Sequence, residues 1–201
     1  MTPEIIEDEE EKPKEKEPKT PENIEAKLLE VRTILVEGPV NDKLFHAVVS
    51  RLLYLEAKDP QANILVVVNS PGGSADSGFG IYDVMRFVAC PVTTVCAGLC
   101  ASAAVLIYLG GRVGRRFALP NCRFLLHQPS TQAFGQASDM EISAKEILRT
   151  RKRFAAIVAQ EIGATSEKIE ADSNRDFWLT AEEGVKYGLA AKIVTHRAEI
   201  Q

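Results

Sequence analysis

The chain has 201 residues, of which 45% are hydrophobic, so it is long enough for one domain with a substantial core. The formal net charge of −4 argues against nucleic acid as a main partner, because phosphate binding requires a basic face. The charge is uneven: residues 1–22 hold nine acidic residues and four lysines, a net charge of −5, which leaves +1 for the rest of the chain.

The first 22 residues are rich in glutamate, lysine and proline, and they predict a disordered tail because they contain too few apolar residues to bury a face. This composition is the opposite of a signal peptide, so we expect a cytoplasmic protein, or one in an equivalent plastid or organelle compartment. Residues 23–201 form the expected globular domain. Its cysteines are not arranged as CxxC pairs, which favours free buried thiols over disulfides or metal ligands: Cys90, Cys96, Cys100 and Cys122.

From Ile24 onward, β-branched apolar runs alternate with segments of helical periodicity. This alternation predicts an α/β fold with a mostly parallel sheet. The predicted strands are 33–36, 64–68, 92–97, 123–126 and 191–194. The predicted helices are 42–57, 75–88, 101–109, 137–162, 166–172 and 181–187.

The stretch from Arg86 to Arg112 contains no charged residue between its ends and is long enough to be a membrane-span candidate. Pro91 interrupts it early, and Gly98 predicts a turn between a β-branched run and a buried helix. We therefore interpret this stretch as strand, turn and helix rather than as a membrane span.

Two side chains lie where catalytic groups often occur in parallel α/β folds. Ser102 stands at a predicted strand–helix junction, where it could cap the helix or act as a nucleophile near free backbone N–H groups. His127 ends an apolar strand and could be a structural histidine or a general base. From the residues alone, the structural explanation is slightly favoured for each.

Two further segments could complete such a site. Gly72 and Gly73 follow a buried strand and could form a simple turn or bring backbone N–H groups to an oxyanion. Either Asp172 or Asp176 could orient a histidine, although Arg175 could instead pair with one of them. The joint presence of these groups favours acyl transfer over the separate structural explanations.

Seven segments then show that the chain resembles the proteolytic subunit of the Clp protease, the ClpP family. The resemblance runs from about Leu28 to Arg197, and its segments stand in family order: NSPGG (69–73), AS (101–102), RFALPN (116–121), LHQP (126–129), GQASDMEI (135–142), AKEIL (144–148) and AEEGVKYGL (181–189).

The resemblance implies a crotonase-like α/β fold of repeated β-β-α units with a protruding strand–helix handle. The head would comprise about 23–125 and 175–197, and the handle about 128–162. The implied activity is that of a serine endopeptidase that requires neither a metal nor another cofactor. The residues that match the family's functional positions are Ser102 as nucleophile, His127 as base, Asp176 as orienting acid, Gly73 and Ala103 as backbone oxyanion donors, and Pro129, Ser130 and Thr131 as substrate contacts.

The resemblance also implies partners. The family stacks two seven-membered rings around a chamber, and hexameric ATPases feed unfolded polypeptides into it. No nucleic acid or membrane partner is implied, and the rings could be uniform or mixed. The matching ring-contact positions are Gln136, Glu141 and Arg175, and the ATPase-docking positions are Leu53, Leu65, Val67 and Phe87.

Several residues depart from the family pattern and predict a divergent member. Ala103-Ala104 stands where Met-Gly is usual, which changes the pocket beside the nucleophile, and 130–134 lacks the usual glycine pair. Asn174 replaces an acid, and Leu65 and Val67 replace aromatic residues of the docking pocket. Three alternatives remain open: a non-catalytic subunit of a mixed ring, a crotonase-fold acyl-CoA lyase or isomerase, and an SppA-like peptidase. The Ser-His-Asp set counts against all three.

Overall fold

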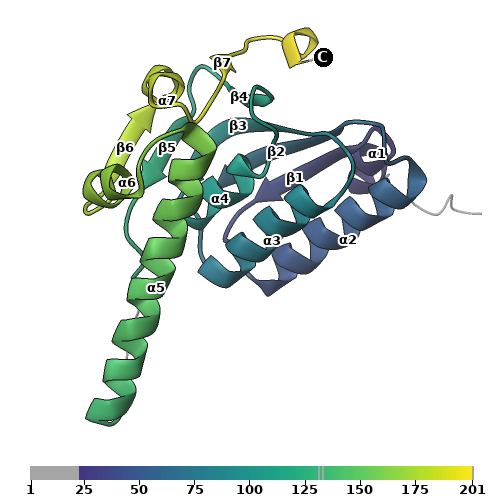
Figure 1. Cartoon of the computed structure of the whole chain (residues 1–201). Coiled ribbons are helices and arrows are strands. Elements are labelled where there is room, and N and C mark those ends of the chain that lie inside the picture. The colour runs from purple at the N-terminus through teal and green to yellow at the C-terminus, as the bar shows by residue number, and fades with distance from the viewer. Residues whose placement is uncertain (1–22, 131, 133, 201) are drawn as a thin grey trace, which may run out of the picture.

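The structure is a computed structural model that describes residues 23–200 except 131 and 133, so the expected tail lies outside the described residues. A sheet and its covering helices form the body of the molecule (Figure 1). In chain order, the elements are α1 (Ile24–Glu30), β1 (Thr33–Glu37), α2 (Asp42–Lys58), β2 (Ile64–Ser70), α3 (Ala75–Phe87), β3 (Val92–Ala101), α4 (Ala103–Leu109), β4 (Arg116–Ala118), β5 (Arg123–Leu126), α5 (Ala137–Ile162), α6 (Ser166–Asp172), β6 (Phe177–Thr180), α7 (Ala181–Tyr187), β7 (Lys192–Ile193) and a 3-10 turn (Arg197–Ile200).

The sheet is parallel in the order β1-β2-β3-β4-β7. Strand β3 is long enough to pair with both β4 and β5. Its first half pairs with β4, and its last residues, Leu99 to Ala101, pair with β5. The antiparallel strand β6 then pairs with β5. The carboxyl ends of β3 and β5 therefore lie side by side, which is where parallel α/β sheets place their functional groups.

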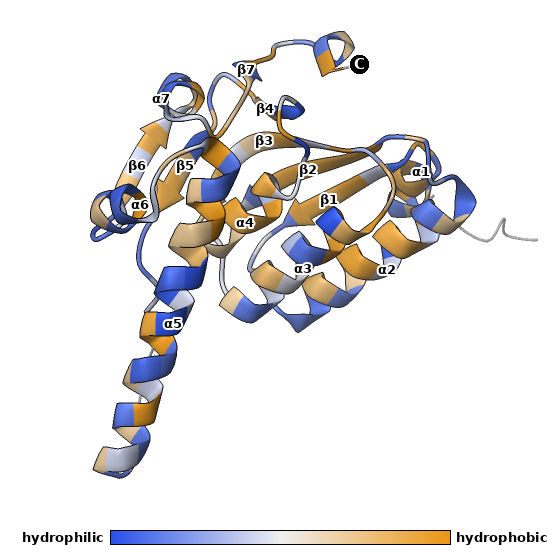
Figure 2. Ribbon diagram, in the orientation of Figure 1, coloured by the Kyte–Doolittle hydropathy of each residue, from blue (hydrophilic) through white to orange (hydrophobic). Residues whose placement is uncertain are grey.

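The strands of the sheet are largely apolar along their length, and the helices that cover them carry both apolar and polar residues (Figure 2). Val48, Leu52 and Leu55 are the buried residues of α2, at the spacing that helical periodicity predicts. Every residue of α4 is buried, because this helix lies between the sheet and the other helices. A buried α4 directly after β3 gives the chain a rigid support at the strand–helix junction.

Helix α5 extends far beyond the body of the molecule (Figure 1). Its buried residues all lie in its carboxyl-terminal part, from Phe154 onward. The amino-terminal part exposes the apolar side chains of Met140, Ile142 and Leu148. This protruding helix agrees with the helical part of the predicted handle, whereas the described residues between β5 and α5 form no strand.

A buried polar network attaches the base of α5 to the body. Glu161 accepts a hydrogen bond from the Tyr82 hydroxyl at 2.5 Å and forms an ion pair with Arg116. Arg116 also donates to the Glu161 carbonyl at 3.1 Å and to the Gly111 carbonyl at 2.8 Å. The network therefore joins α3, α5 and β4. The hydrogen bonds among its polar groups offset the free-energy cost of removing these groups from water.

The α/β fold is confirmed, and helices α5, α6 and α7 have the predicted bounds. The predicted turn at Gly98 is wrong. The strand continues to Ala101 through a register shift opposite Val68 to Ser70, with Gly98 at φ 102° and Leu99 N–H donating to Asn69 Oδ1 at 3.1 Å. The helix predicted from 101 begins at 103, after the exceptional backbone of residue 102.

The short elements α1, β4 and β6 were not predicted from the sequence. Strands of three and four residues carry too little periodicity to be recognised without their sheet partners. Among the described residues, no helix is both long enough and apolar enough to cross a membrane. The uncharged stretch that suggested a span is divided between β3 and α4.

Candidate active site

Ser102 occupies a strained turn between β3 and α4. Its φ of 55° and ψ of −125° lie in a region that residues with a side chain rarely adopt, at a typical cost of about 1–3 kcal/mol. The Ser102 hydroxyl does not cap α4, and it makes no hydrogen bond to any other residue that the structure describes. The Ser102 N–H donates to the Leu125 carbonyl at 2.9 Å, which fixes the turn against β5. Helix capping therefore does not explain this serine.

The glycine pair passes close to the same turn. A Cβ atom on Gly72 would lie 2.6 Å from the Ala101 carbonyl oxygen and 2.7 Å from the Ser102 Cβ. A Cβ atom on Gly73 would overlap the Val40 carbonyl oxygen. Gly72 and Gly73 have φ values of 86° and 148°, which residues with a side chain rarely adopt. Glycine is therefore favoured at both positions by the backbone conformation as well as by the lack of space for a Cβ atom. This close passage brings the Gly73 backbone to the cavity beside Ser102.

The side chains of Ser102 and His127 line a common cavity of about 240 Å³. His127 follows β5 directly and is half-buried, with 30% of its side chain exposed. Six predicted site residues therefore meet here, since Gly73, Ala103, Pro129 and Ser130 also line the cavity. Its other lining residues are Ser74, Ala75, Phe79, Leu106, Thr150 and Phe154.

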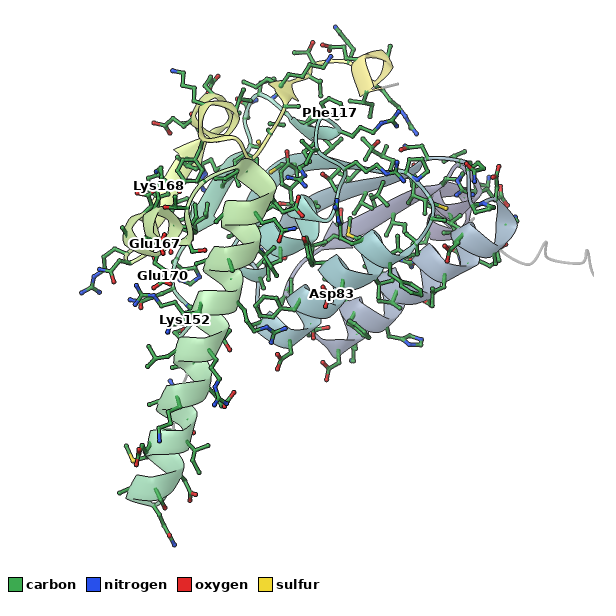
Figure 3. The ribbon with its side chains drawn as sticks, viewed as in Figure 1. Asp83, Phe117, Lys152, Glu167, Lys168 and Glu170 are labelled. Atoms are coloured by element: carbon green, nitrogen blue, oxygen red, sulfur yellow. The ribbon has the colours of Figure 1, made fainter. Side chains whose placement is uncertain are left out.

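The two candidate acids, Asp172 and Asp176, have different partners in the structure. Asp176 Oδ1 lies 3.9 Å from His127 Nδ1, and both residues line a second cavity of about 560 Å³ beside the first. Asp172 instead accepts a hydrogen bond from the Tyr187 hydroxyl at 2.6 Å and pairs with Lys168. Figure 3 labels Lys168 on α6, beside Glu167 and Glu170.

The electrostatics of Asp172 fit a structural role. Partial burial opposes its ionisation, but the hydrogen bonds from Lys168 and Tyr187 hold the pKa of Asp172 below its usual range. Burial is the main cause that raises the pKa of Tyr187, and the hydrogen bond that its hydroxyl donates to Asp172 raises this pKa further. These partners occupy the Asp172 carboxylate, whereas the Asp176 side chain is 65% exposed and close to the histidine.

The hydrogen bonds of a complete triad are not made in the single chain. The separation of 3.9 Å between His127 and Asp176 exceeds hydrogen-bond length, and no hydrogen bond joins Ser102 to His127 within the described part of the chain. His127 shares one cavity with Ser102 and a second cavity with Asp176. Such loose geometry is common in catalytic sites without a bound substrate.

The other predicted positions are spread over the surface. Arg175 is exposed beside Asp176, and Glu141 pairs with Lys145 on α5 at 2.7 Å. Gln136 precedes α5, and Thr131 lies outside the described residues.

The four predicted docking positions lie on three elements, α2, β2 and α3. Leu65 lines a cavity near the start of the sheet with Val31 and Asn63, and the other three positions take no part in it. Phe87 is 79% exposed at the end of α3, Leu53 is exposed on α2, and Val67 is half-buried on β2.

All four cysteines are buried and free. Hydrogen bonds with neighbouring thiols, together with burial, raise the pKa of both Cys96 and Cys122, which makes reactive thiolates unfavourable there. Among residues 23–200 apart from the two gaps, no cluster of histidine, cysteine and carboxylate side chains is suited to a metal ion.

The cavity walls that α3, α4 and α5 supply were not predicted from the sequence: Phe79, Leu106, Thr150 and Phe154. The apolar periodicity of Phe79, Leu106 and Phe154 predicts burial but does not distinguish a cavity wall from the core, and Thr150 carries no signal of its own. Only the packing of α5 across α3 and α4 brings them to Ser102.

Comparison with known proteins defines the class of this fold. The structure superimposes on a ClpP1 mutant from Listeria monocytogenes with a TM-score of 0.82 and 36% sequence identity, covering 89% of this chain and 99% of that chain. The architecture is therefore the mixed α/β fold of ClpP.

A family profile described as Clp protease matches residues 15–197, so the chain belongs to the Clp protease family. It is a Clp-type protease, and this membership supports serine peptidase activity in general. The match begins at residue 15, within the acidic segment and earlier than the start near Leu28 that the motifs suggest.

Proposed function

We propose that this protein is a serine endopeptidase in which Ser102 is the nucleophile, His127 the general base and Asp176 the orienting acid. The observation that carries the proposal is the strained backbone of Ser102, which leaves its uncapped hydroxyl in a cavity shared with His127. A strained backbone conformation persists only where the surrounding structure holds the residue in place, and such residues are concentrated at functional sites.

In the proposed mechanism, Ser102 Oγ attacks the carbonyl carbon of a peptide bond while His127 Nε2 takes the hydroxyl proton. His127 then gives this proton to the leaving amine, and the acyl group remains on Ser102. Asp176 accepts a hydrogen bond from His127 Nδ1–H, which fixes the tautomer and stabilises the imidazolium. Water, deprotonated by His127, attacks the acyl-enzyme; the acyl–Oγ bond breaks, the acid product leaves, and His127 returns the proton to Ser102 Oγ.

The backbone N–H groups of Gly73 and Ala103 are the proposed oxyanion donors. Both residues line the cavity of Ser102, and neither N–H donates to another described residue. Donors fixed by backbone stabilise the tetrahedral oxyanion without reorganisation, and losing one such donor typically costs about 3–4 kcal/mol of barrier. Because the donors are backbone groups, alanine at residue 103 can serve as well as a larger residue.

The proposed substrates are unfolded polypeptides cut to short peptides inside a chamber of two stacked seven-membered rings, with a hexameric ATPase as feeding partner. Pro129, Ser130 and Thr131 would contact the extended substrate. Two observations support an assembled active form: the exposed apolar side chains on α5, and the separation of 3.9 Å between His127 and Asp176. Contacts between copies could supply the small shift that closes this distance.

Labelling with a fluorophosphonate tests the proposal. The intact, assembled protein should be labelled at Ser102, and the Ser102→Ala variant should lose both labelling and peptide hydrolysis while keeping the wild-type native mass. A known serine hydrolase serves as the labelling control. Absence of labelling in a protein whose assembly is confirmed by native mass would overturn the proposal.

The open hydrogen-bond geometry also favours a second candidate, a non-catalytic subunit that acts only in ring assembly. Under this alternative, the Ser102→Ala substitution would leave the activity of a mixed ring unchanged. The same native-mass and labelling measurements distinguish the two functions.

A further inference from the structure

We propose that Gln128 is a positioning residue that holds the loop carrying Asp176 beside His127. This inference rests on the proposed function. The loop of residues 174–176, called here the acid loop, connects α6 to β6 and is exposed to solvent. Its carboxylate and the imidazole come from distant parts of the chain, so some contact must hold the two segments together.

The residues on either side of His127 each contact one flank of the acid loop. Leu126 pairs with Phe177 at the end of the β5–β6 ladder. On the other side, the Gln128 N–H donates to the Ser173 carbonyl at 2.8 Å. His127 therefore lies opposite the loop, between two points of attachment.

The side chain of Gln128 adds a bond to the loop itself. Its Nε2 donates to the Asn174 carbonyl at 2.9 Å, joining residues 46 positions apart in the chain. Within the part of the chain that the structure describes, this is the one side-chain hydrogen bond to the acid loop. Removing it leaves the backbone attachments intact but frees the loop near Asn174.

The attachment at Ser173 is rigid. Ser173 is buried, and its hydroxyl donates to the Ile169 carbonyl at 2.6 Å, which fixes this residue to α6. The Gln128 side chain therefore also attaches Asn174, the residue after Ser173, which belongs to the exposed acid loop. Because a displacement of about 1 Å in a catalytic group can cost up to 10²-fold in rate, a bond that limits loop motion near Asp176 affects catalysis.

The expected signature is a loss of rate without a loss of binding. Gln128→Met keeps the length of the side chain but removes the donor. In the assembled enzyme, we expect kcat for a peptide to fall by about tenfold or more, with KM changed by less than about twofold. Gln160→Met, the same change at an exposed position of α5 outside the site, is the matched control and should leave both constants unchanged.

A double-mutant cycle separates positioning from a general structural effect. If Gln128 acts through Asp176, adding Gln128→Met to Asp176→Ala should slow fluorophosphonate labelling by less than about twofold more. If the fold-loss of labelling rate in the double variant equals the product of the losses in the two single variants, the proposal is contradicted. An unchanged kcat in Gln128→Met would also contradict it.

Hydrogen exchange gives a readout that does not depend on activity. The peptide covering residues 173–179 should exchange faster in Gln128→Met than in wild type and in Gln160→Met, while peptides of β2 and α4 remain unchanged. Unchanged exchange at 173–179 would overturn the positioning role. If this exchange rises but the wild-type protein is neither labelled nor active, the proposed peptidase function fails and the attachment of the loop stands.

Discussion

At the scale of residues, the choice between two nearby carboxylates depends on which partners each one has. Asp172 ends α6 and is occupied by Lys168 and Tyr187, whereas Asp176 lies 3.9 Å from His127. A carboxylate already bonded to a cation and a hydroxyl contributes to stability, and one beside an imidazole can orient it.

This difference predicts opposite effects for two amide substitutions. Asp176→Asn should lower kcat by roughly 10⁴-fold, because the amide favours the wrong histidine tautomer. Asp172→Asn should change kcat by less than about threefold but reduce stability, since it weakens the bonds to Lys168 and Tyr187. Peptide kinetics and urea unfolding of both variants measure these effects. Equal kinetic losses would show that the assignment of the acid is wrong.

The Asp172 effect should depend on pH. Its lowered folded pKa means that its contribution is present above the unfolded value of 3.8 and is lost as pH falls through the folded pKa. The stability difference between wild type and Asp172→Asn should therefore shrink as the pH falls below about 4.

At the scale of elements, α5 is held to the body mainly near its carboxyl end. Arg116 and Glu161 form a buried pair, Tyr82 donates to the same carboxylate, and the Arg153 guanidinium lies 4.1 Å from the centre of the Phe79 ring. Phe79 and Phe154, which follows Arg153 on α5, both line the cavity of Ser102. The anchoring of the protruding helix and the shape of the cavity therefore depend on the same contacts.

Removing one partner of the buried pair should be costly. We expect Glu161→Ala to reduce the free energy of unfolding by about 3–5 kcal/mol, because it leaves Arg116 charged and unpaired in the core. The double variant Glu161→Leu/Arg116→Met should be more stable than Glu161→Ala, since no charge remains buried. Chemical denaturation measures both; a double variant less stable than the single one would contradict this account.

The same network predicts an alkaline effect. Burial and the hydrogen bond to Glu161 raise the pKa of Tyr82 to about 12. This contribution to stability is complete below pH 10 and is lost as the pH rises from about 10 to about 12. Tyr82→Phe should remove this part of the alkaline loss, measured as thermal stability against pH. An alkaline loss of the same size in Tyr82→Phe as in wild type would contradict this account.

At the scale of the whole molecule, the protruding part of α5 (Figure 1) carries apolar side chains that the described residues leave exposed. Met140, Ile142 and Leu148 are each about half exposed or more. Exposed apolar side chains gathered on one projecting element indicate an interaction surface, and assembly of two rings through this helix would cover them.

We expect Ile142→Glu/Leu148→Glu to prevent the joining of two rings and to leave the fold of the protomer intact, because neither side chain is buried in the single chain. Native mass spectrometry would then detect smaller assemblies, and circular dichroism would match wild type. Val113→Glu, at an exposed apolar position away from α5, is the control. Full-size particles in the double variant would show that α5 does not join the rings.

Much of the fold followed from local patterns. The buried runs of β2 and β3 and the periodicity of α2, α5 and α7 identified an α/β protein, because these segments are long enough to repeat their pattern several times. The strands β4 and β6 could not be recognised, since each depends on its neighbour in the sheet rather than on its own residues. The turn expected at Gly98 was wrong for a related reason: the Asn69 side chain, distant in sequence, supports a bulge there.

The sequence by itself determined which residue types are present and in what order: a serine after a buried strand, a histidine after another, adjacent glycines and two candidate acids. It also carried the motifs from which the family was expected. The tertiary structure decided which of these groups meet, which carboxylate is already occupied, and which helices form the walls of the cavity. These are contacts between residues far apart in the chain, and local propensity holds no information about them because the packing of the sheet and its helices creates them.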